Sequence, residues 1–287
     1  MKLLNSYIDD LINRALLEDI IYIDIATDYL IPETHESTAF MVAKDNGVLA
    51  GIDVAMRVFG ILDPKVQVTK LKNDGDNVSF GEKLVNIHGN TAALLKGERT
   101  ALNILQHMSG IATAVAKLQS QCEGTNCHIC ETRKTLPGLR TLEKYAVLCG
   151  GGRNHRFNLS DAAMIKDNHI DAYGGLRPAV ETLRKKIGHM NRIEVEVRNL
   201  KELNEALDCG CEVIMLDNMT PALMKECVEI VNKRAILEAS GNITIENVRE
   251  VAKTGVDVIS IGAITHSVKA FDISMKIGEK NDDTLPG

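Results

Sequence analysis

After Asn126 the sequence alternates between short apolar runs and longer amphipathic runs, and no other feature constrains the fold as much. The apolar runs read HICET, AAMIKD, IEVEV, EVIMLD, AILEAS and VDVISIG. The amphipathic runs have apolar residues at helical spacing and read LRTLEKYAVLCG, GGLRPAVETLRKK, LKELNEALD, PALMKECVEIVNK and TIENVREVAKTG. Apolar strands that alternate with helices are typical of a parallel sheet with helices outside it. Six consecutive units favour an α/β barrel over an open sheet.

The residues before this repeat have a different pattern. Residues 36–91 contain short β-rich runs, such as STAFMVAKD and VQVTKLK, which Gly and Asp interrupt. A long run with apolar residues at i, i+3 and i+4 follows from Gly97 and predicts a helix. The N-terminal run MKLLNSYIDDLINRALLEDI predicts another amphipathic helix. The 287 residues therefore fit the α/β class, with one large domain or two smaller ones.

Charge and hydropathy argue against two classes of partner. The net charge is −6, so we expect no broad surface for nucleic acid, and the basic residues must act locally. The sequence has no run of about 18 apolar residues, so we expect no membrane span. Because the N-terminal run lacks the core and cleavage site of a signal peptide, we expect a cytoplasmic protein.

The seven cysteines are expected to be reduced thiols. Cys122, Cys127 and Cys130, with Cys149 further on, have the spacing of a plant-type iron–sulfur loop. Cys127 and Cys130, however, lead into a predicted strand, on which side chains three residues apart face opposite ways. We therefore expect buried thiols rather than a cluster.

Polar residues recur where the predicted strands end. In chain order, the six strand ends carry Arg133, Lys166, Glu196, Asp217, Ser240 and Gly262. The last three intervals are 21, 23 and 22 residues, the length of one strand–helix unit, so these residues should share one face of the barrel. One such residue alone can be a helix cap, as Ser240 and Asp217 could be. Six positions in register indicate a site.

The chemistry of this face divides into three groups. Cations gather before and within GGGRNHRFNLSDAAMIKDNHI, and planar arginine groups suit carboxylates. Glu196 and Asp217 are available for ribose hydroxyls, a metal ion or an electron-poor sugar carbon. The runs EASGN and ISIGAITHS place backbone N–H groups where phosphate binds in barrels. The pattern predicts the joining of an anionic organic acid to a sugar phosphate.

Long motifs in the chain resemble those of the quinolinate phosphoribosyltransferase family. They read ETRKTLPGLRTLEKYAV, GGGRNHRFNLSDAAMIKDNHI, IEVEV with IMLDNM, EASGNIT and GVDVISIGAITHSVKAFDIS. The resemblance covers nearly the whole chain, including AKDNGVLAG and GERTALNILQHMSGIAT. It implies an N-terminal α/β sandwich domain over residues 1–108, joined by the C-terminal segment 269–287. It also implies an irregular, open α/β barrel over residues 109–268.

The resemblance further implies a reaction in de novo NAD biosynthesis. Quinolinate attacks C1 of 5-phosphoribosyl 1-pyrophosphate, giving nicotinate mononucleotide, pyrophosphate and carbon dioxide. Mg²⁺ arrives with the pyrophosphate substrate and is expected near Glu196 and Asp217, and no organic cofactor is implied. The implied assembly is a homodimer or hexamer in which Arg99, in GERTALN, reaches the site of the neighbouring subunit.

The implied site residues follow from the matching motifs. For quinolinate and nearby phosphate groups they are Thr132, Arg133, Lys134, His155, Arg156 and Lys166. For the ribose and the charge at C1 they are Glu196 and Asp217, which with Lys134 are the implied catalytic residues. For the 5-phosphate they are Ser240, Gly241, Asn242, Gly262, Ala263, Ile264 and His266.

The sequence departs from the family pattern at two places. EDIIYIDIATDYLIP, residues 18–32, replaces a glycine-containing turn, and Leu136 stands where Thr is common. These departures affect the local geometry around them and leave the assigned site residues intact.

Three other functions agree with parts of the sequence. A paralogous pyrophosphorylase-like protein associated with molybdate transport would share the fold, but the intact TRK, NHR and DNH segments argue against it. A barrel aldolase could use Lys166 as a Schiff-base lysine, but the dense cations and paired acids fit phosphoribosyl transfer better. A carrier module around DGDNVSFGEKLVNIHG would need an exposed hairpin lysine for its prosthetic group, and we see no such context.

Overall fold

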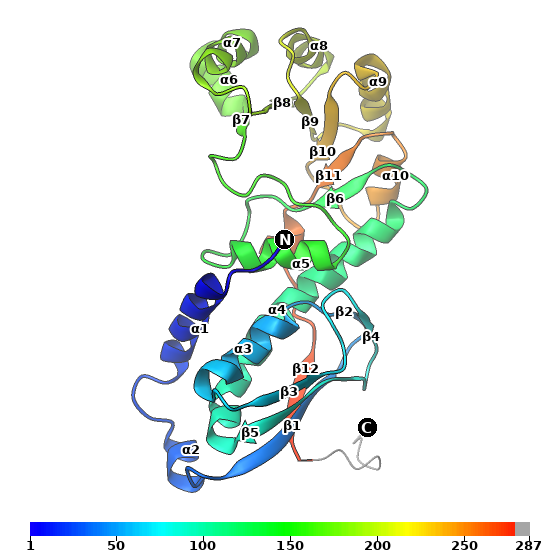
Figure 1. Ribbon diagram of the computed structural model, residues 1–287. Coiled ribbons are helices and arrows are strands. Elements are labelled where there is room, and N and C mark those ends of the chain that lie inside the picture. Colours follow the sequence, from blue (N-terminus) through cyan, green and yellow to red (C-terminus); the bar gives the residue numbers. More distant parts are fainter. Residues whose placement is uncertain (279–287) are drawn as a thin grey trace. The chain divides into compact units, whose positions relative to one another are not determined.

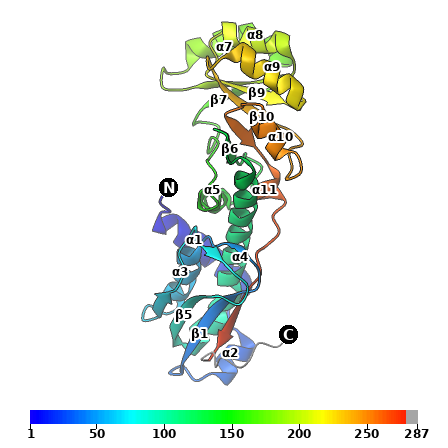
Figure 2. The ribbon, with the colours of Figure 1, turned by 90° about the vertical axis from the view of Figure 1, so that its right-hand side faces the viewer.

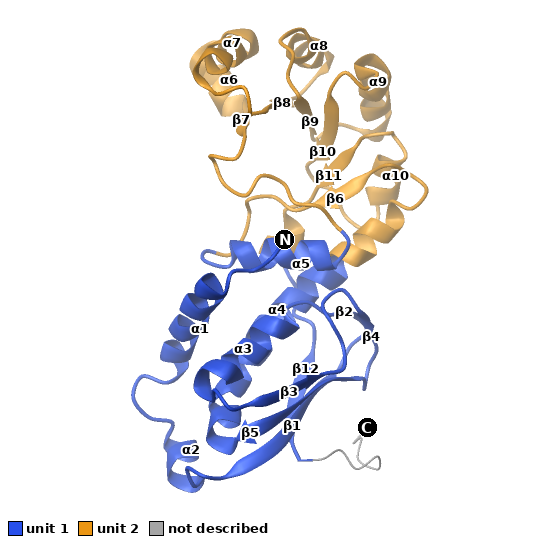
Figure 3. Cartoon of the chain, viewed as in Figure 1, with its two compact units in different colours: residues 1–114, 137–151, 268–287 blue, residues 115–136, 152–267 orange. Residues whose placement is uncertain are grey.

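The computed structural model describes residues 1–278, and the chain forms two compact units (Figure 3). Unit 1 comprises residues 1–114, 137–151 and 268–287, and unit 2 comprises residues 115–136 and 152–267. Part of the predicted C-terminal segment 269–287, residues 279–287, lies outside the described residues. Residues 137–151 group with unit 1, although they fall within the range predicted for the barrel domain.

Unit 1 is built on an antiparallel sheet with the strand order β12-β1-β5-β3 (Figure 1). Its strands are β1 (Glu36–Ala43), β3 (Gln67–Lys70), β5 (Lys83–Asn90) and β12 (Ile273–Ile277). A separate antiparallel pair consists of β2 (Gly47–Val48) and β4 (Asn77–Val78). Because β12 pairs with β1, residues near both ends of the chain share one sheet.

The helices of unit 1 are α1 (Asn5–Asp19), α2 (Ile25–Leu30), α3 (Ile52–Leu62) and α5 (Arg140–Cys149). Helix α4 (Thr91–Gln121) contributes residues to both units. Gly97 brings α4 close to α3, since a Cβ atom there would lie 3.0 Å from the ring of Phe59. Helix α3 also contacts α1.

Unit 2 contains a six-stranded parallel sheet with the order β6-β11-β10-β9-β8-β7. The strands are β6 (His128–Cys130), β7 (Ala163–Ile165), β8 (Ile193–Val197), β9 (Val213–Asp217), β10 (Ile236–Ser240) and β11 (Val258–Ser260). The helices are α6 (Asp167–Tyr173), α7 (Leu176–Lys186), α8 (Leu200–Asp208), α9 (Pro221–Val231), α10 (Val248–Ala252) and α11 (Ala263–His266). Helices α7, α8 and α9 lie along one side of the sheet (Figure 2).

The predicted α/β class is confirmed. All six apolar runs after Asn126 form strands of the parallel sheet, and every residue of β8 is buried. Burial on both faces is what a parallel strand covered by helices requires. The described residues contain no helix that is long and apolar enough to cross a membrane.

Four helices differ from the prediction, and one of them, α2, lies in the segment 18–32, for which the sequence pattern predicts no helix. Helix α3 lies within residues 36–91, where the sequence pattern predicts short strands, and α4 begins at Thr91 rather than at Gly97. Helix α6 begins directly after the end of β7, where the sequence pattern predicts no helix. At its start the ring of His169 accepts a hydrogen bond from the Lys166 N–H, at 3.0 Å, so part of the predicted cationic stretch caps a helix.

Candidate active site

A pocket of about 800 Å³ lies in unit 2 where the strands of the parallel sheet end. Fourteen of the residues expected at the site line it, and they come from the ends of all six strands, the loops beyond them and the segment between α5 and β7. They are Thr132, Arg133, Lys134, His155, Arg156, Lys166, Glu196, Asp217, Ser240, Gly241, Asn242, Gly262, Ala263 and His266.

Two expected residues do not line this pocket. Arg99 lies in unit 1 on α4, where its side chain is exposed. Ile264 follows the start of α11 and is buried, at 4% exposure.

The loop after β6 holds Arg133 and Lys134 in the pocket wall. The Thr132 hydroxyl accepts a hydrogen bond from the Lys134 N–H, at 3.0 Å. The Thr265 hydroxyl donates to the Lys134 carbonyl, at 2.8 Å, and so fastens this loop to α11. Gly262 makes the close approach possible, because a Cβ atom there would lie 2.8 Å from Cδ of Lys134.

Buried Glu131 joins this loop to the next group of cations. Its carboxylate accepts hydrogen bonds from the Asn154 amide and from the His155 N–H, both at 3.1 Å. Arg156 donates from Nη1 to the Ala162 carbonyl at 2.9 Å. Burial and the charge of Arg133 lower the pKa of Arg156, which indicates a place where an anion would be stabilised.

The ring of His155 lies between two glutamates on strands of the sheet. Its Nε2 atom is 3.3 Å from Oε2 of Glu194 and 3.5 Å from Oε1 of Glu238, and all three side chains are at most 8% exposed. Burial alone would lower the pKa of His155, but the bonds and charges of the two glutamates outweigh it and raise the pKa to about 10. The Arg156 N–H, 2.8 Å from Nδ1, favours the neutral ring. The two carboxylates are the stronger influence, because each carries a full charge whereas the N–H group is only a dipole.

The two acids predicted for the centre of the site are in neighbouring strands. Glu196 is almost buried, at 9% exposure, and its Oε2 atom lies 3.3 Å from Nζ of half-exposed Lys166. Asp217 is partly buried at the end of β9, beside Ser240 in the register of β10. The acids thus lie between the cations and the loop after β10.

That loop and the loop after β11 supply backbone groups. Gly241 has a φ of 93° and Asn242 a φ of 52°, both in the left-handed region that turns the chain sharply. Gly262 precedes α11, whose first N–H groups have no partner within the helix. Small residues and backbone N–H groups on this side suit a phosphate.

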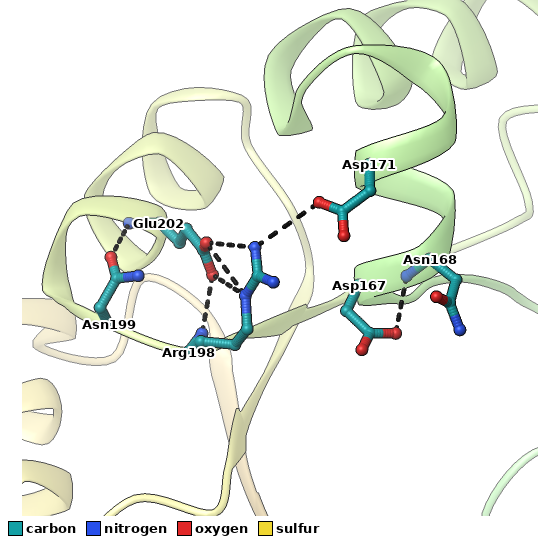
Figure 4. A network of polar contacts seen from close by, with 6 residues as sticks. All are labelled: Asp167, Asn168, Asp171, Arg198, Asn199 and Glu202. Atoms are coloured by element: carbon teal, nitrogen blue, oxygen red, sulfur yellow. Dashed lines mark hydrogen bonds and ion pairs between the residues drawn. The ribbon is translucent and has the colours of Figure 1, made fainter.

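Outside the pocket, polar contacts fix the segments after β7 and β8 (Figure 4). Arg198 binds both carboxylate oxygens of Glu202 and lies 3.9 Å from Asp171 of α6. Asn199 caps α8 by accepting the Glu202 N–H, at 3.0 Å. These contacts tie α6 to the start of α8, next to the strand ends that carry Lys166 and Glu196.

Some residues of the site were not predicted. Glu194 and Glu238 stand in the middle of apolar strands, and this interruption was the only signal in the sequence. Asn218, Thr244 and the apolar wall residues also line the pocket; the latter are Met164, Met215, Ile243 and Ile261. Asn218 directly follows a strand end, so its position could have indicated it.

The chain was compared with known protein families, protein sequences and solved structures. The family model "Quinolinate phosphoribosyl transferase, N-terminal domain" matches residues 24–109, and the corresponding C-terminal model matches residues 111–276. A protein of Bacillus subtilis (strain 168), "Probable nicotinate-nucleotide pyrophosphorylase [carboxylating]", is 44% identical over 272 residues, which are 95% of this chain and 94% of that protein. The chloroplastic protein of that name from Arabidopsis thaliana is 44% identical over 285 residues, covering 93% and 81%.

Solved structures give the same result. NadC from Streptococcus pyogenes aligns with a TM-score of 0.94 and 38% identity, covering 98% of this chain and all of that one. The nicotinate-nucleotide pyrophosphorylase from Francisella tularensis aligns with a TM-score of 0.92 and 39% identity, covering 96% and 98%.

Proposed function

The chain belongs to the quinolinate phosphoribosyltransferase family, and we propose that the pocket at its strand ends is where this reaction occurs. The protein is a phosphoribosyltransferase. It converts quinolinate and 5-phosphoribosyl 1-pyrophosphate to nicotinate mononucleotide, pyrophosphate and carbon dioxide, which is a step of NAD biosynthesis. One observation carries the assignment to this pocket. Five cations, two acids and two phosphate-type loops line the same 800 Å³ of space.

The cationic wall fits an aromatic dicarboxylate. Lys166 pairs with Glu196, and His155 lies between Glu194 and Glu238. Arg133, Lys134 and Arg156 line the same wall and add further positive charge. Two adjacent carboxylates on one ring need this density, since each is best held by a separate charged donor. A substrate with one carboxylate would leave part of the wall without a partner.

The acids face the sugar in this arrangement. When the bond between C1 and pyrophosphate breaks, positive charge develops on the ribose, and Glu196 and Asp217 would stabilise it. The cations would hold the departing pyrophosphate, whose oxygen takes the bonding electron pair. Magnesium carried by that substrate would neutralise the charge of the leaving group. Mg²⁺ prefers oxygen ligands, and the carboxylates of Glu196 and Asp217 would supply them.

The chemistry then passes to the pyridine ring. The ring nitrogen forms the new bond to C1 and becomes positively charged. This charge accepts the electron pair left when the C2 carboxylate departs as carbon dioxide, and C2 then takes up a proton. No covalent bond to the enzyme is needed, so the residues act by binding, orientation and charge.

The loops after β10 and β11 would hold the 5-phosphate. Ser240, Gly241 and Asn242 form one side, and Gly262, Ala263 and His266 the other, with Ile264 supporting α11 from its buried position. Holding the phosphate fixes the far end of the sugar relative to the two acids.

We also propose a homodimer, or a hexamer of such dimers, in which Arg99 completes the site of a neighbouring subunit. The exposed position of Arg99 on α4 supports this. A cytoplasmic location is supported by seven cysteines that are all free thiols.

The test is product formation from quinolinate, phosphoribosyl pyrophosphate and Mg²⁺, with nicotinate and nicotinamide as parallel substrates. We expect nicotinate mononucleotide and carbon dioxide from quinolinate alone. Activity on nicotinate instead would contradict the dicarboxylate wall. Inactivity on all three would favour the molybdate-associated paralogue.

A further inference from the structure

Asn218 follows Asp217 at the end of β9 and lies in the wall of the pocket. Its φ of 53° is in the left-handed region, which few residues other than glycine and asparagine adopt easily. Its N–H donates to the Ser240 carbonyl at 2.9 Å. The backbone after β9 is therefore fastened to the end of β10.

The side chain of Asn218 continues this connection. Its Nδ2 atom donates to Oδ2 of Asp217 at 2.9 Å, and its Oδ1 atom accepts from Nδ2 of Asn242 at 3.0 Å. A carboxylate can only accept hydrogen bonds, so the NH₂ group must face Asp217 and the carbonyl must face Asn242. The charge on Asp217 thus sets the direction of both bonds.

The loop after β10 also packs against this amide. A Cβ atom on Gly241 would lie 2.2 Å from Oδ1 of Asn218. Beyond it, Asn247 donates from Nδ2 to the Asn242 carbonyl at 3.0 Å and accepts the Thr244 N–H at 2.8 Å. An unbroken series of bonds therefore runs from the acid of β9 through the whole loop.

We propose that Asn218 is a positioning residue that sets the distance between Asp217 and the phosphate loop 240–242. The inference rests on the proposed function, in which one sugar phosphate meets Asp217 near C1 and the loop at its 5-phosphate. Asn218 is exposed in the free enzyme, so its bonds add little to stability. They place both contact groups before the substrate arrives, and small misplacements of such groups slow reactions strongly.

Two substitutions separate this role from packing. Asn218→Asp keeps the shape but turns an oxygen toward Asp217, so the hydrogen bond to Asp217 is lost and the two carboxylates repel each other. Asn218→Gly removes the amide and keeps the positive φ accessible. For both, we expect kcat to fall about tenfold or more and the KM for phosphoribosyl pyrophosphate to rise. Quinolinate binding without that substrate, measured by calorimetry, should stay within about twofold.

Asn232 provides the matched control. It has a φ of 42°, is exposed, and follows α9 in the same unit. Asn232→Asp and Asn232→Gly should match the wild type in kcat and KM. Equal losses of kcat in Asn218→Gly and Asn232→Gly would overturn the inference, because the loss of an asparagine from a left-handed backbone position would then explain both.

Wild-type kinetics in the Asn218→Asp variant would also overturn it, since the shape alone would then suffice. These results differ from failure of the proposed function. In that case the wild-type enzyme itself makes no nicotinate mononucleotide from quinolinate, and the inference falls with its premise.

Discussion

Protonation of His155 should control how well the pocket holds a carboxylate. Glu194 and Glu238 raise its pKa from 6.5 to about 10 against the effect of burial. A raised folded pKa means that the proton stabilises the fold fully below about pH 6.5 and that this contribution is lost as the pH rises through 10. The ring should therefore stay cationic at neutral pH, where an ordinary histidine is mostly neutral.

Quinolinate affinity is expected to stay constant from about pH 6 to about pH 8.5 in the wild-type enzyme. Glu194→Gln removes one carboxylate, lowers the pKa of His155, and should make the affinity fall at lower pH. Calorimetric titration across this range measures both profiles, with His155→Gln as the control that lacks the titrating ring. Superimposable profiles for the wild type and Glu194→Gln would contradict the role of the glutamate.

The strand-end residues could be predicted from the sequence because they repeat with the period of a strand–helix unit. Glu196 and Asp217 are examples, and the structure places both in the pocket wall. Glu194 and Glu238 could not be assigned in the same way. A charged residue within an apolar strand gives no sign of which histidine it will meet, and His155 lies 39 and 83 residues away along the chain.

Helix α3 shows why one element was missed. Its first N–H groups are capped by Asp74, whose Oδ1 atom accepts from Gly51 N and Ile52 N at 2.8 and 2.9 Å. The capping residue is thus more than 20 residues away in the sequence, so the usual local start signal is missing. The six strands could be predicted without knowledge of a distant contact, because their apolar composition indicates them directly.

Asp74→Ala should destabilise unit 1 by about 2 kcal/mol, because it leaves two helix N–H groups and the Tyr145 hydroxyl without their partner. Tyr145→Phe removes only the last of these bonds and should cost about 1 kcal/mol. Urea unfolding, followed by circular dichroism, gives the free energy of unfolding for each. Equal losses would show that the cap of α3 contributes nothing.

The loop after β10 depends on Gly241 for two reasons. Its φ is 93°, and a side chain would collide with the amide of Asn218. Gly241→Ala should therefore raise the KM for phosphoribosyl pyrophosphate about tenfold or more, with little change in quinolinate affinity. Gly210→Ala is the control, since Gly210 has a φ of 66° and open space around its Cβ position. If Gly241→Ala and Gly210→Ala had the same KM for phosphoribosyl pyrophosphate, the collision with Asn218 would have no effect on substrate binding.

A single chain exposes more apolar surface than its fold explains. Large apolar side chains between residues 17 and 30 are each at least 63% exposed: Leu17, Ile21, Tyr22, Ile25, Tyr29 and Leu30. Contiguous exposed apolar residues usually mark a contact with another molecule. All of them except Leu17 fall in the segment 18–32, where the sequence departs from the family pattern, so local motifs could not predict what this segment does.

A symmetric dimer that exchanges Arg99 makes a prediction that no monomer can satisfy. Arg99→Ala and Lys166→Ala chains should each be inactive alone, because every site then lacks one cation. After they are mixed, unfolded and refolded together, random pairing should restore roughly a quarter of the wild-type activity, since half of the dimers have one complete site. Activity is measured as nicotinate mononucleotide formed per chain, and size-exclusion chromatography verifies that dimers have formed. In each mixed dimer one chain keeps Lys166 and the other keeps Arg99, so the two residues share a site only if Arg99 reaches the neighbouring subunit. Dimers without recovered activity would therefore place Arg99 outside the neighbouring site.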